Sequence, residues 1–172
     1  AIVVMEPSTG RILAMVSKPD FDPNTIDADW DRIVADENEE SLLLNRASSG
    51  LYPPGSTFKI VTALEFIREN PSGYADYNYH CSGSIQKDSS KLSCYSGEVH
   101  GGVDLRRSFV KSCNTSFANI GLSLNGDHFA DTCKQLLFNQ NLPVEKLDTS
   151  KSSFVLNGKS STSEIMETSI GQ

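Results

Sequence analysis

The sequence predicts an α+β fold in which an antiparallel sheet is covered by helices. Two apolar runs, residues 1–7 and 11–17, flank Ser8-Thr9-Gly10, where glycine permits the positive φ that a three-residue hairpin loop needs. Both runs are apolar on both faces, so we expect helices to cover this hairpin on each side. Apolar residues at helical spacing then recur in three later stretches, residues 56–69, 105–124 and 127–137.

Composition limits the classes of function. The chain has 172 residues, which is enough for one domain with a hydrophobic core. It carries 15 basic and 22 acidic residues, a net charge of −7, with no basic cluster, so we expect no nucleic-acid partner. We find no signal peptide and no apolar segment of membrane-spanning length in the sequence. Because the chain begins inside an expected strand, we expect it to be part of a longer protein.

The helix that follows Tyr-Pro-Pro-Gly at residues 52–55 carries the first candidate site residues. Two prolines give a stiff approach, the glycine permits a sharp turn, and the helix should run until Asn70. Ser56 then lies at the helix N-terminus, where free backbone N–H groups favour developing negative charge. Lys59 follows three residues later on the same face.

Lys59 is unusual at this position because a cation in the first turn opposes the helix dipole. That mismatch would help to lower the pKa of Lys59, and a neutral lysine can take the proton of Ser56 and activate its hydroxyl. The apolar residues of the helix leave almost no polar face, so we expect the helix to be buried in a core. The alternative interpretation is that Ser56 only caps the helix and Lys59 is only a solvated side chain.

The segments between the expected helices are polar and less regular. Residues 18–40 are rich in Asp, Pro and Asn, and we expect an irregular segment with a short helix around residues 30–34. Residues 72–102 are predicted to form a long loop with short strands at most. The tail, residues 142–172, is predicted to be loop-like.

A second polar pair, Ser112 and Asn114, stands at the junction of two expected helices. Asp104 can cap the first of these helices, and the second should run to about Leu124. A hydroxyl at such a junction can relay a proton, and an amide can hold both Lys59 and a substrate carbonyl. The alternative is that Ser112 and Asn114 only cap the two helices. Asn125 then begins a further amphipathic helix.

The four cysteines fit two disulfides, a metal site or buried thiols. Cys81 and Cys94 bracket a serine-rich loop and could pair in an oxidising compartment. His80 and His100 lie nearby, which makes zinc conceivable, but the spacing matches no familiar zinc motif and we expect no metal and no cofactor. The other two, Cys113 and Cys133, fall in helical stretches and are expected to be small buried hydrophobic residues.

Together, Ser56-x-x-Lys59 and Ser112-x-Asn114 resemble the motifs of the penicillin-binding proteins, the D,D-transpeptidases of bacterial cell-wall synthesis. The resemblance runs through most of the chain, with further similar stretches at residues 3–15, 45–47, 100–101 and 168–172. It implies a penicillin-binding and β-lactamase-like fold in which Ser56 is acylated and Lys59 is its general base. Ser112 would relay protons to the leaving group, and Asn114 would contact the substrate amide.

The resemblance also implies partners and a location. The substrate would be a peptidoglycan stem peptide that ends in D-Ala-D-Ala, and β-lactam antibiotics would mimic it. The protein would act at the extracytoplasmic face of the bacterial membrane, with a membrane anchor outside this chain. Cys113 stands where the β-lactamase pattern has aspartate, which favours a penicillin-binding protein. Two alternatives stay open: a membrane β-lactam sensor, and a non-catalytic binding module.

One motif of the family is missing from the sequence. No lysine is followed by Thr-Gly or Ser-Gly, and the nearest sequences are Lys151-Ser152-Ser153 and Lys159-Ser160-Ser161. We therefore expect residues 1–172 to be a single, incomplete transpeptidase domain that precedes this motif. An isolated chain of this length is expected to react with penicillin slowly, if at all.

Overall fold

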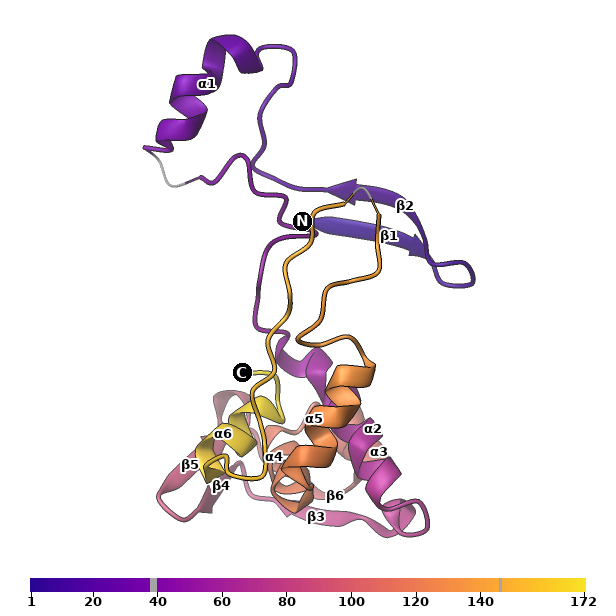
Figure 1. Cartoon of the computed structure of the whole chain (residues 1–172). Helices are drawn as coiled ribbons and strands as arrows, with labels where there is room; N and C mark the ends of the chain where they lie inside the picture. Colours follow the sequence, from indigo (N-terminus) through magenta and orange to yellow (C-terminus); the bar gives the residue numbers. More distant parts are fainter. Residues whose placement is uncertain (38–39, 146) are drawn as a thin grey trace. The chain divides into compact units, whose positions relative to one another are not determined.

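The computed structural model describes residues 1–37, 40–145 and 147–172. The chain divides into two compact units. The first comprises residues 1–52 and 141–151, and the second comprises residues 53–140 and 152–172. In the described residues the strands form three two-stranded antiparallel sheets, accompanied by helices (Figure 1). This confirms the predicted α+β class. None of the helices in those residues combines the length and apolarity needed to cross a bilayer.

The first unit contains the predicted hairpin. Strand β1 (Ile2–Glu6) pairs with β2 (Arg11–Val16), and the N–H of Gly10, at φ +73°, donates to Glu6 O at 2.9 Å. The polar segment after the hairpin contains α1 (Ile26–Ala35), which is longer than the short helix expected around residues 30–34.

The expected cover over the hairpin is not observed. Among the residues that the structure describes, apolar side chains of β1 and β2 stay accessible, with Ile2 64% and Leu13 57% exposed. Cover by helices on both sides therefore stays a prediction for this hairpin. An apolar strand sequence specifies a surface that can be buried, but it does not specify which segment buries it.

The second unit holds the remaining elements. It has 3₁₀ turns at Gly55–Phe58, Tyr74–Asp76 and Tyr95–Gly97. Its strands are β3 (Asn78–Cys81), β4 (Ser84–Lys87), β5 (Ser90–Ser93) and β6 (Gly101–Asp104). Its helices are α2 (Lys59–Glu69), α3 (Leu105–Val110), α4 (Asn114–Ser123), α5 (Gly126–Gln135) and α6 (Thr162–Thr168). Strand β3 pairs with β6, and β4 with β5, so the segment predicted as a loop does contain short strands.

Two side-chain clusters form the core of this unit. Helix α4 is buried over most of its length and packs with α2 and α6 around Phe66, Phe117 and Met166. A second cluster of aromatic rings joins Phe58 to Phe129, Phe138 and Phe154, with centroid distances of 5.7–5.9 Å from Phe58. The end of helix α2 that carries the candidate residues is therefore held by packing from two directions.

Helix α2 has one buried face and one exposed face, although its sequence is apolar on most sides. The buried positions Lys59, Thr62, Glu65 and Phe66 lie at helical spacing on one face. On the opposite face Ile60 is 59% exposed. The predicted burial in a core is therefore confirmed for the first face, whereas the opposite face stays exposed.

The helix caps follow local sequence rules. The Asp104 side chain accepts from Arg107 N at 2.6 Å, and that of Asn125 accepts from Asp127 N at 2.9 Å, as the sequence predicted. Helix α6 was missed in the predicted loop-like tail. Its capping box, in which Ser161 and Glu164 bond reciprocally, is a sequence signal that could have found it.

A buried polar pair links helices α2 and α5 and gives a first testable prediction. The Thr132 hydroxyl donates to the buried Glu65 carboxylate and accepts from Arg68 Nη1 at 2.7 Å. Thr132→Val keeps the side-chain shape but leaves Glu65 without this donor, so unfolding free energy should fall by about 2 kcal/mol. Urea denaturation measures the change, with Thr132→Ser as the control that keeps the hydroxyl. Equal stability of the valine and serine variants would contradict the prediction.

Candidate active site

Ser56 and Lys59 are positioned by a tight turn ahead of helix α2. Gly55 adopts φ +57°, and its N–H donates to Gly171 O at 3.0 Å. Ser56 follows in the 3₁₀ turn Gly55–Phe58, and Lys59 is the first residue of α2, with its N–H bonded to Ser56 O. The sequence placed Ser56 at the start of the α-helix; in the structure it lies in the 3₁₀ turn just before it, which still brings both side chains to one side.

Ser112 and Asn114 are positioned by the junction between α3 and α4. Ser112 adopts φ +49°, and the next residue, Cys113, donates its N–H to Ser108 O at 2.9 Å. This left-handed residue reverses the chain so that Asn114 begins α4. The Asn114 amide donates through Nδ2 to Ser93 O, at the end of β5, at 3.1 Å. Nothing in the sequence indicates this role of Ser93, because a backbone carbonyl is common to all residues.

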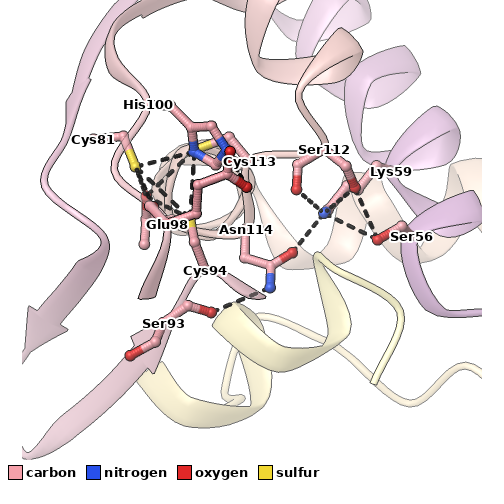
Figure 2. Close-up of polar contacts among 11 residues, drawn as sticks. Ser56, Lys59, Cys81, Ser93, Cys94, Glu98, His100, Ser112, Cys113 and Asn114 are labelled. Atoms are coloured by element: carbon pink, nitrogen blue, oxygen red, sulfur yellow. Dashed lines mark hydrogen bonds and ion pairs between the residues drawn. The ribbon is translucent and has the colours of Figure 1, made fainter. Parts of the chain in front are cut away.

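The four side chains singled out in the sequence meet around the Lys59 amine (Figure 2). Lys59 Nζ lies 3.2 Å from Ser56 Oγ, 3.0 Å from Ser112 Oγ and 2.6 Å from Asn114 Oδ1. It also lies 2.8 Å from the backbone oxygen of Ser112. Ser112 Oγ is 3.0 Å from Ser56 Oγ, so the two hydroxyls and the amine form a closed triangle.

These contacts suit a neutral amine. An ammonium group has three N–H donors and no acceptor, whereas four oxygen atoms surround Nζ. A neutral amine can donate to the two oxygens that only accept, Asn114 Oδ1 and Ser112 O. Its lone pair then faces a hydroxyl and can accept the Ser56 proton. This arrangement has the donors and acceptors that removal of the Ser56 proton requires.

Burial of Lys59 also favours the neutral amine. Lys59 is 1% exposed, so its side chain is almost completely withdrawn from water. Burial lowers the pKa of Lys59 from its ordinary 10.5 to about 8, although the nearby thiols of Cys113 and Cys94 oppose this shift. A substantial fraction of the amine is therefore neutral at slightly alkaline pH. The main cause of the lowered pKa is burial, whereas the sequence had suggested a helix-dipole mismatch.

A cavity of about 350 Å³ opens beside these groups. Its lining includes Ser56, Ser112 and Asn114 with their neighbours Gly55 and Lys111. The loop after β5 adds Tyr95, Glu98 and His100, and the end of the chain adds Ile170 and Gln172. A ligand in this cavity would contact both hydroxyls. Residues after α6 were not predicted to line a site, because nothing in their sequence shows that they pack against Gly55.

Three cysteines and a histidine gather next to the site. Cys81, Cys94 and Cys113 are buried free thiols, and their Sγ atoms and His100 Nδ1 all lie within 4.8 Å of one another (Figure 2). Cys81 Sγ and Cys94 Sγ are 3.7 Å apart, so the pair expected to be close is close but is not bridged. Cys113 is buried as predicted, but it belongs to this polar cluster. Cys133 packs among phenylalanine rings, as predicted.

The polar cluster favours a thiolate at one of its sulfurs. Burial opposes ionisation of Cys81, but hydrogen bonds from the Thr115 hydroxyl and from His100 outweigh it and lower the pKa of Cys81 to about 6. For Cys113, by contrast, burial dominates and raises the pKa to about 12. The cluster thus differs from an ordinary apolar core, in which every buried thiol stays protonated.

Comparison with known proteins places this site in context. The whole chain, residues 1–172, matches the family model described as the penicillin-binding protein transpeptidase domain. It is 37% identical over 138 residues to the peptidoglycan D,D-transpeptidase PbpA of Mycobacterium tuberculosis. It is 31% identical over 154 residues to the peptidoglycan D,D-transpeptidase MrdA of Acinetobacter baumannii. These matches cover 74% and 84% of this chain but only 28% and 22% of the two relatives.

Solved structures resemble the fold over nearly the whole chain. The ceftriaxone acyl-enzyme complex of penicillin-binding protein A from M. tuberculosis has a TM-score of 0.81 and 32% identity, covering 99% of this chain and 40% of that one. The D,D-transpeptidase domain of a peptidoglycan glycosyltransferase from Eggerthella lenta has a TM-score of 0.87 and 29% identity, with the same two coverages. Family model, relatives and fold agree, and the chain belongs to the penicillin-binding protein transpeptidase family.

Proposed function

We propose that this chain carries the acylation site of a peptidoglycan D,D-transpeptidase, with Ser56 as the nucleophile. The observation that carries this proposal is the buried Lys59 amine, 3.2 Å from Ser56 Oγ and held by Ser112 and Asn114. A serine hydroxyl is a weak nucleophile until a nearby base removes its proton. Lys59, with a pKa lowered by burial to about 8, is such a base.

The proposed reaction is acyl transfer. Neutral Lys59 accepts the Ser56 proton while Ser56 Oγ attacks the carbonyl carbon between the two D-alanines of a peptidoglycan stem peptide. The C–N bond then breaks, the peptide becomes an ester on Ser56, and the departing D-alanine amine receives a proton. Ser112 Oγ lies 3.0 Å from both Lys59 Nζ and Ser56 Oγ, so it can pass that proton from Lys59 to the amine.

Two further groups have proposed roles around this reaction. The Asn114 amide keeps the lysine in place through Oδ1 and would contact the substrate amide at the cavity. The Ser56 N–H would be one of two donors to the tetrahedral oxyanion. An acceptor amine from a second stem peptide would finally attack the ester and free Ser56. A β-lactam would enter the same first step and stay attached as an ester after its ring opens.

The cellular setting is part of the proposal. Residues 1–172 would form one incomplete transpeptidase domain, in a protein anchored in the membrane and acting on its extracytoplasmic face. Relatives named as transpeptidases favour turnover over the alternatives of a β-lactam sensor or a non-catalytic module. The four contacts around Lys59 also argue against a module that has lost its chemistry, because a buried lysine without a role would be costly to keep.

A labelling experiment tests the proposal. The full-length protein is incubated with a fluorescent penicillin, digested, and searched by mass spectrometry for the adduct. We expect one adduct, on the peptide that contains Ser56, with labelling blocked by an excess of unlabelled penicillin and absent from heat-denatured protein. An adduct on another serine, or equal labelling of native and denatured protein, would overturn the assignment of Ser56.

A further inference from the structure

We propose that Glu65, Glu69 and His128 bind one divalent first-row transition-metal ion, such as Zn²⁺ or Mn²⁺, between helices α2 and α5. The proposal is independent of the acyl-transfer function, because these three residues line a different cavity from the one beside Ser56. It differs from the expectation, drawn from the sequence, that the chain has no metal.

Helical spacing brings the three side chains together. Glu65 and Glu69 are four residues apart on α2, so their side chains lie one turn apart on the same side of the helix. His128 lies in the first turn of α5, which packs against α2 (Figure 1). One oxygen of each carboxylate and one ring nitrogen of His128 all lie within 4.8 Å of one another. A single ion between the two helices can therefore contact all three.

The separation of the imidazole from the nearer carboxylate matches metal coordination. His128 Nδ1 lies 3.3 Å from Glu69 Oε1. In a tetrahedral site with Zn–N and Zn–O bonds of about 2.0–2.2 Å, two ligand atoms lie about 3.3–3.5 Å apart. An ion can therefore bridge these two atoms at ordinary bond lengths with little movement of either side chain.

The buried carboxylate of Glu65 independently points to a cation. Glu65 is only 2% exposed, yet its side chain lines a cavity of about 540 Å³. Its Oε2 accepts from the Thr132 hydroxyl, whereas within residues 1–37, 40–145 and 147–172 no donor bonds to Oε1 and the carboxylate forms no ion pair. A buried carboxylate without a cation is costly, and an ion in this cavity would remove that cost.

The charges around the cavity also favour a divalent cation. Glu65, Glu69 and Asp131 contribute three negative charges to the lining, and Arg68 contributes one positive charge. With a neutral imidazole, the lining has two negative charges in excess, which one divalent ion balances. The Arg68 guanidinium is directed to the Thr132 hydroxyl, to which Nη1 donates at 2.7 Å.

Hydrogen bonds hold both carboxylates in place. The two oxygens of Glu69 accept from the Asn125 N–H, at 3.1 and 3.2 Å, and Thr132 donates to Glu65. Carboxylates that ligate metals are usually oriented by such additional partners. Each carboxylate oxygen can accept more than one bond, so a metal can bind without displacing these donors.

The ligand set selects the kind of metal. Carboxylate and imidazole ligands together suit zinc and manganese, whereas magnesium and calcium prefer sites made entirely of oxygen ligands. Three protein ligands leave further coordination positions for water on the side of the cavity. Because Glu69 ends α2 and His128 begins α5, the ion would fasten the end of one helix to the start of the next.

Binding of Mn²⁺ to the full-length protein tests the site, because the thiolates of the chain do not suit this ion. Electron paramagnetic resonance distinguishes free from bound Mn²⁺. We expect one bound ion per chain, displaced by an excess of Zn²⁺ but not by the same excess of Mg²⁺. Glu69→Gln and His128→Ala should each weaken binding more than about 100-fold. Asp131→Asn removes a charge from the same cavity but no ligand, and should weaken binding much less than either.

The two ligand variants are chosen to fold. The His128 side chain is 66% exposed, and glutamine at position 69 keeps an acceptor for the Asn125 N–H. Hydrogen exchange then locates the ion. At a Mn²⁺ concentration 100 times the Kd, exchange in residues 65–70 and 125–132 should slow by up to about 100-fold.

Four results would overturn the site. These are no binding of Mn²⁺, displacement by Mg²⁺ as readily as by Zn²⁺, wild-type affinity in both ligand variants, and protection from exchange only outside the two segments. Wild-type protein that binds one Mn²⁺ here but is never labelled by penicillin would support the metal site and contradict only the proposed function.

Discussion

Replacing Lys59 by methionine will slow acylation of Ser56 by penicillin about 10²- to 10⁴-fold, the usual contribution of a general base. Methionine fills much of the same buried volume but cannot accept the Ser56 proton. The rate constant for labelling by a fluorescent penicillin, measured under pseudo-first-order conditions, gives the effect. Lys159→Met removes an exposed lysine outside the cavity and should leave that rate unchanged.

The pH dependence of the wild-type rate supplies a second readout for Lys59. Only the neutral amine can accept a proton, and the pKa of Lys59 is lowered by burial to about 8. The labelling rate should therefore rise through a single inflection near pH 8 and level off above it. A rate that is flat from pH 6 to pH 10, or a methionine variant as fast as wild type, would show that another group is the base.

The lowered pKa of Lys59 also makes the stability of the folded chain depend on pH. Between about pH 8 and the ordinary pKa of 10.5, the unfolded chain holds the Lys59 proton while the folded chain has lost it. Because the unfolded state then binds more protons, the contribution of Lys59 to stability rises with pH across this window. Below about pH 8 the folded state bears the full cost of a buried ammonium. The methionine variant should lack this rise in unfolding free energy.

Replacing Gly171 by alanine will destabilise the second unit by about 3 kcal/mol and disturb the turn that carries Ser56. Gly171 adopts φ +85°, and a Cβ at this position would lie 2.0 Å from Gly55 O. Both the strained backbone and the collision oppose the Gly55 N–H to Gly171 O bond, 3.0 Å long in the native chain. Chemical denaturation and penicillin labelling should both report the loss.

Gly10→Ala is the matched control for the Gly171 variant. Gly10 also has a positive φ, +73°, but a Cβ there would have no atom within 4 Å. It should therefore show only the backbone cost, about 1–2 kcal/mol, with labelling unchanged. If both alanine variants lose the same stability and both keep the wild-type labelling rate, then contact between Gly171 and Gly55 does not support the site.

The features that could be predicted from the sequence are those that depend on residues close together in the chain. Gly10 and the flanking apolar runs specify the β1–β2 hairpin, and Asp104 and Asn125 specify helix starts, because each acts within a few residues of itself. The candidate site residues were recognised by motif resemblance. Their mutual distances could not be predicted, since Lys59 meets Asn114 only through the packing of α2 against α4.

The cluster of three cysteines and His100 shows why some contacts could not be predicted from the sequence. Its four residues occupy positions 81, 94, 100 and 113, a spacing that resembles no familiar zinc motif. They become neighbours through the register of β3 with β6 and the length of the β4–β5 hairpin. Both features lie in a segment whose polar sequence predicted mostly loop. The pairing of β3 with β6 joins segments that are distant in the sequence, and the local pattern of each strand does not specify such a partner.

The left-handed backbone of Ser112 has a consequence for how this chain can change over evolutionary time. A serine at φ +49° costs about 1–2 kcal/mol relative to an unstrained residue, and glycine would remove most of that cost. Selection for a more stable fold alone would therefore drive this position away from serine. Selection for the hydroxyl opposes it for as long as the chemistry is needed. In descendants that have lost activity, position 112 should be among the first of the four site residues to be substituted. Glycine or asparagine at this position would then indicate an inactive relative.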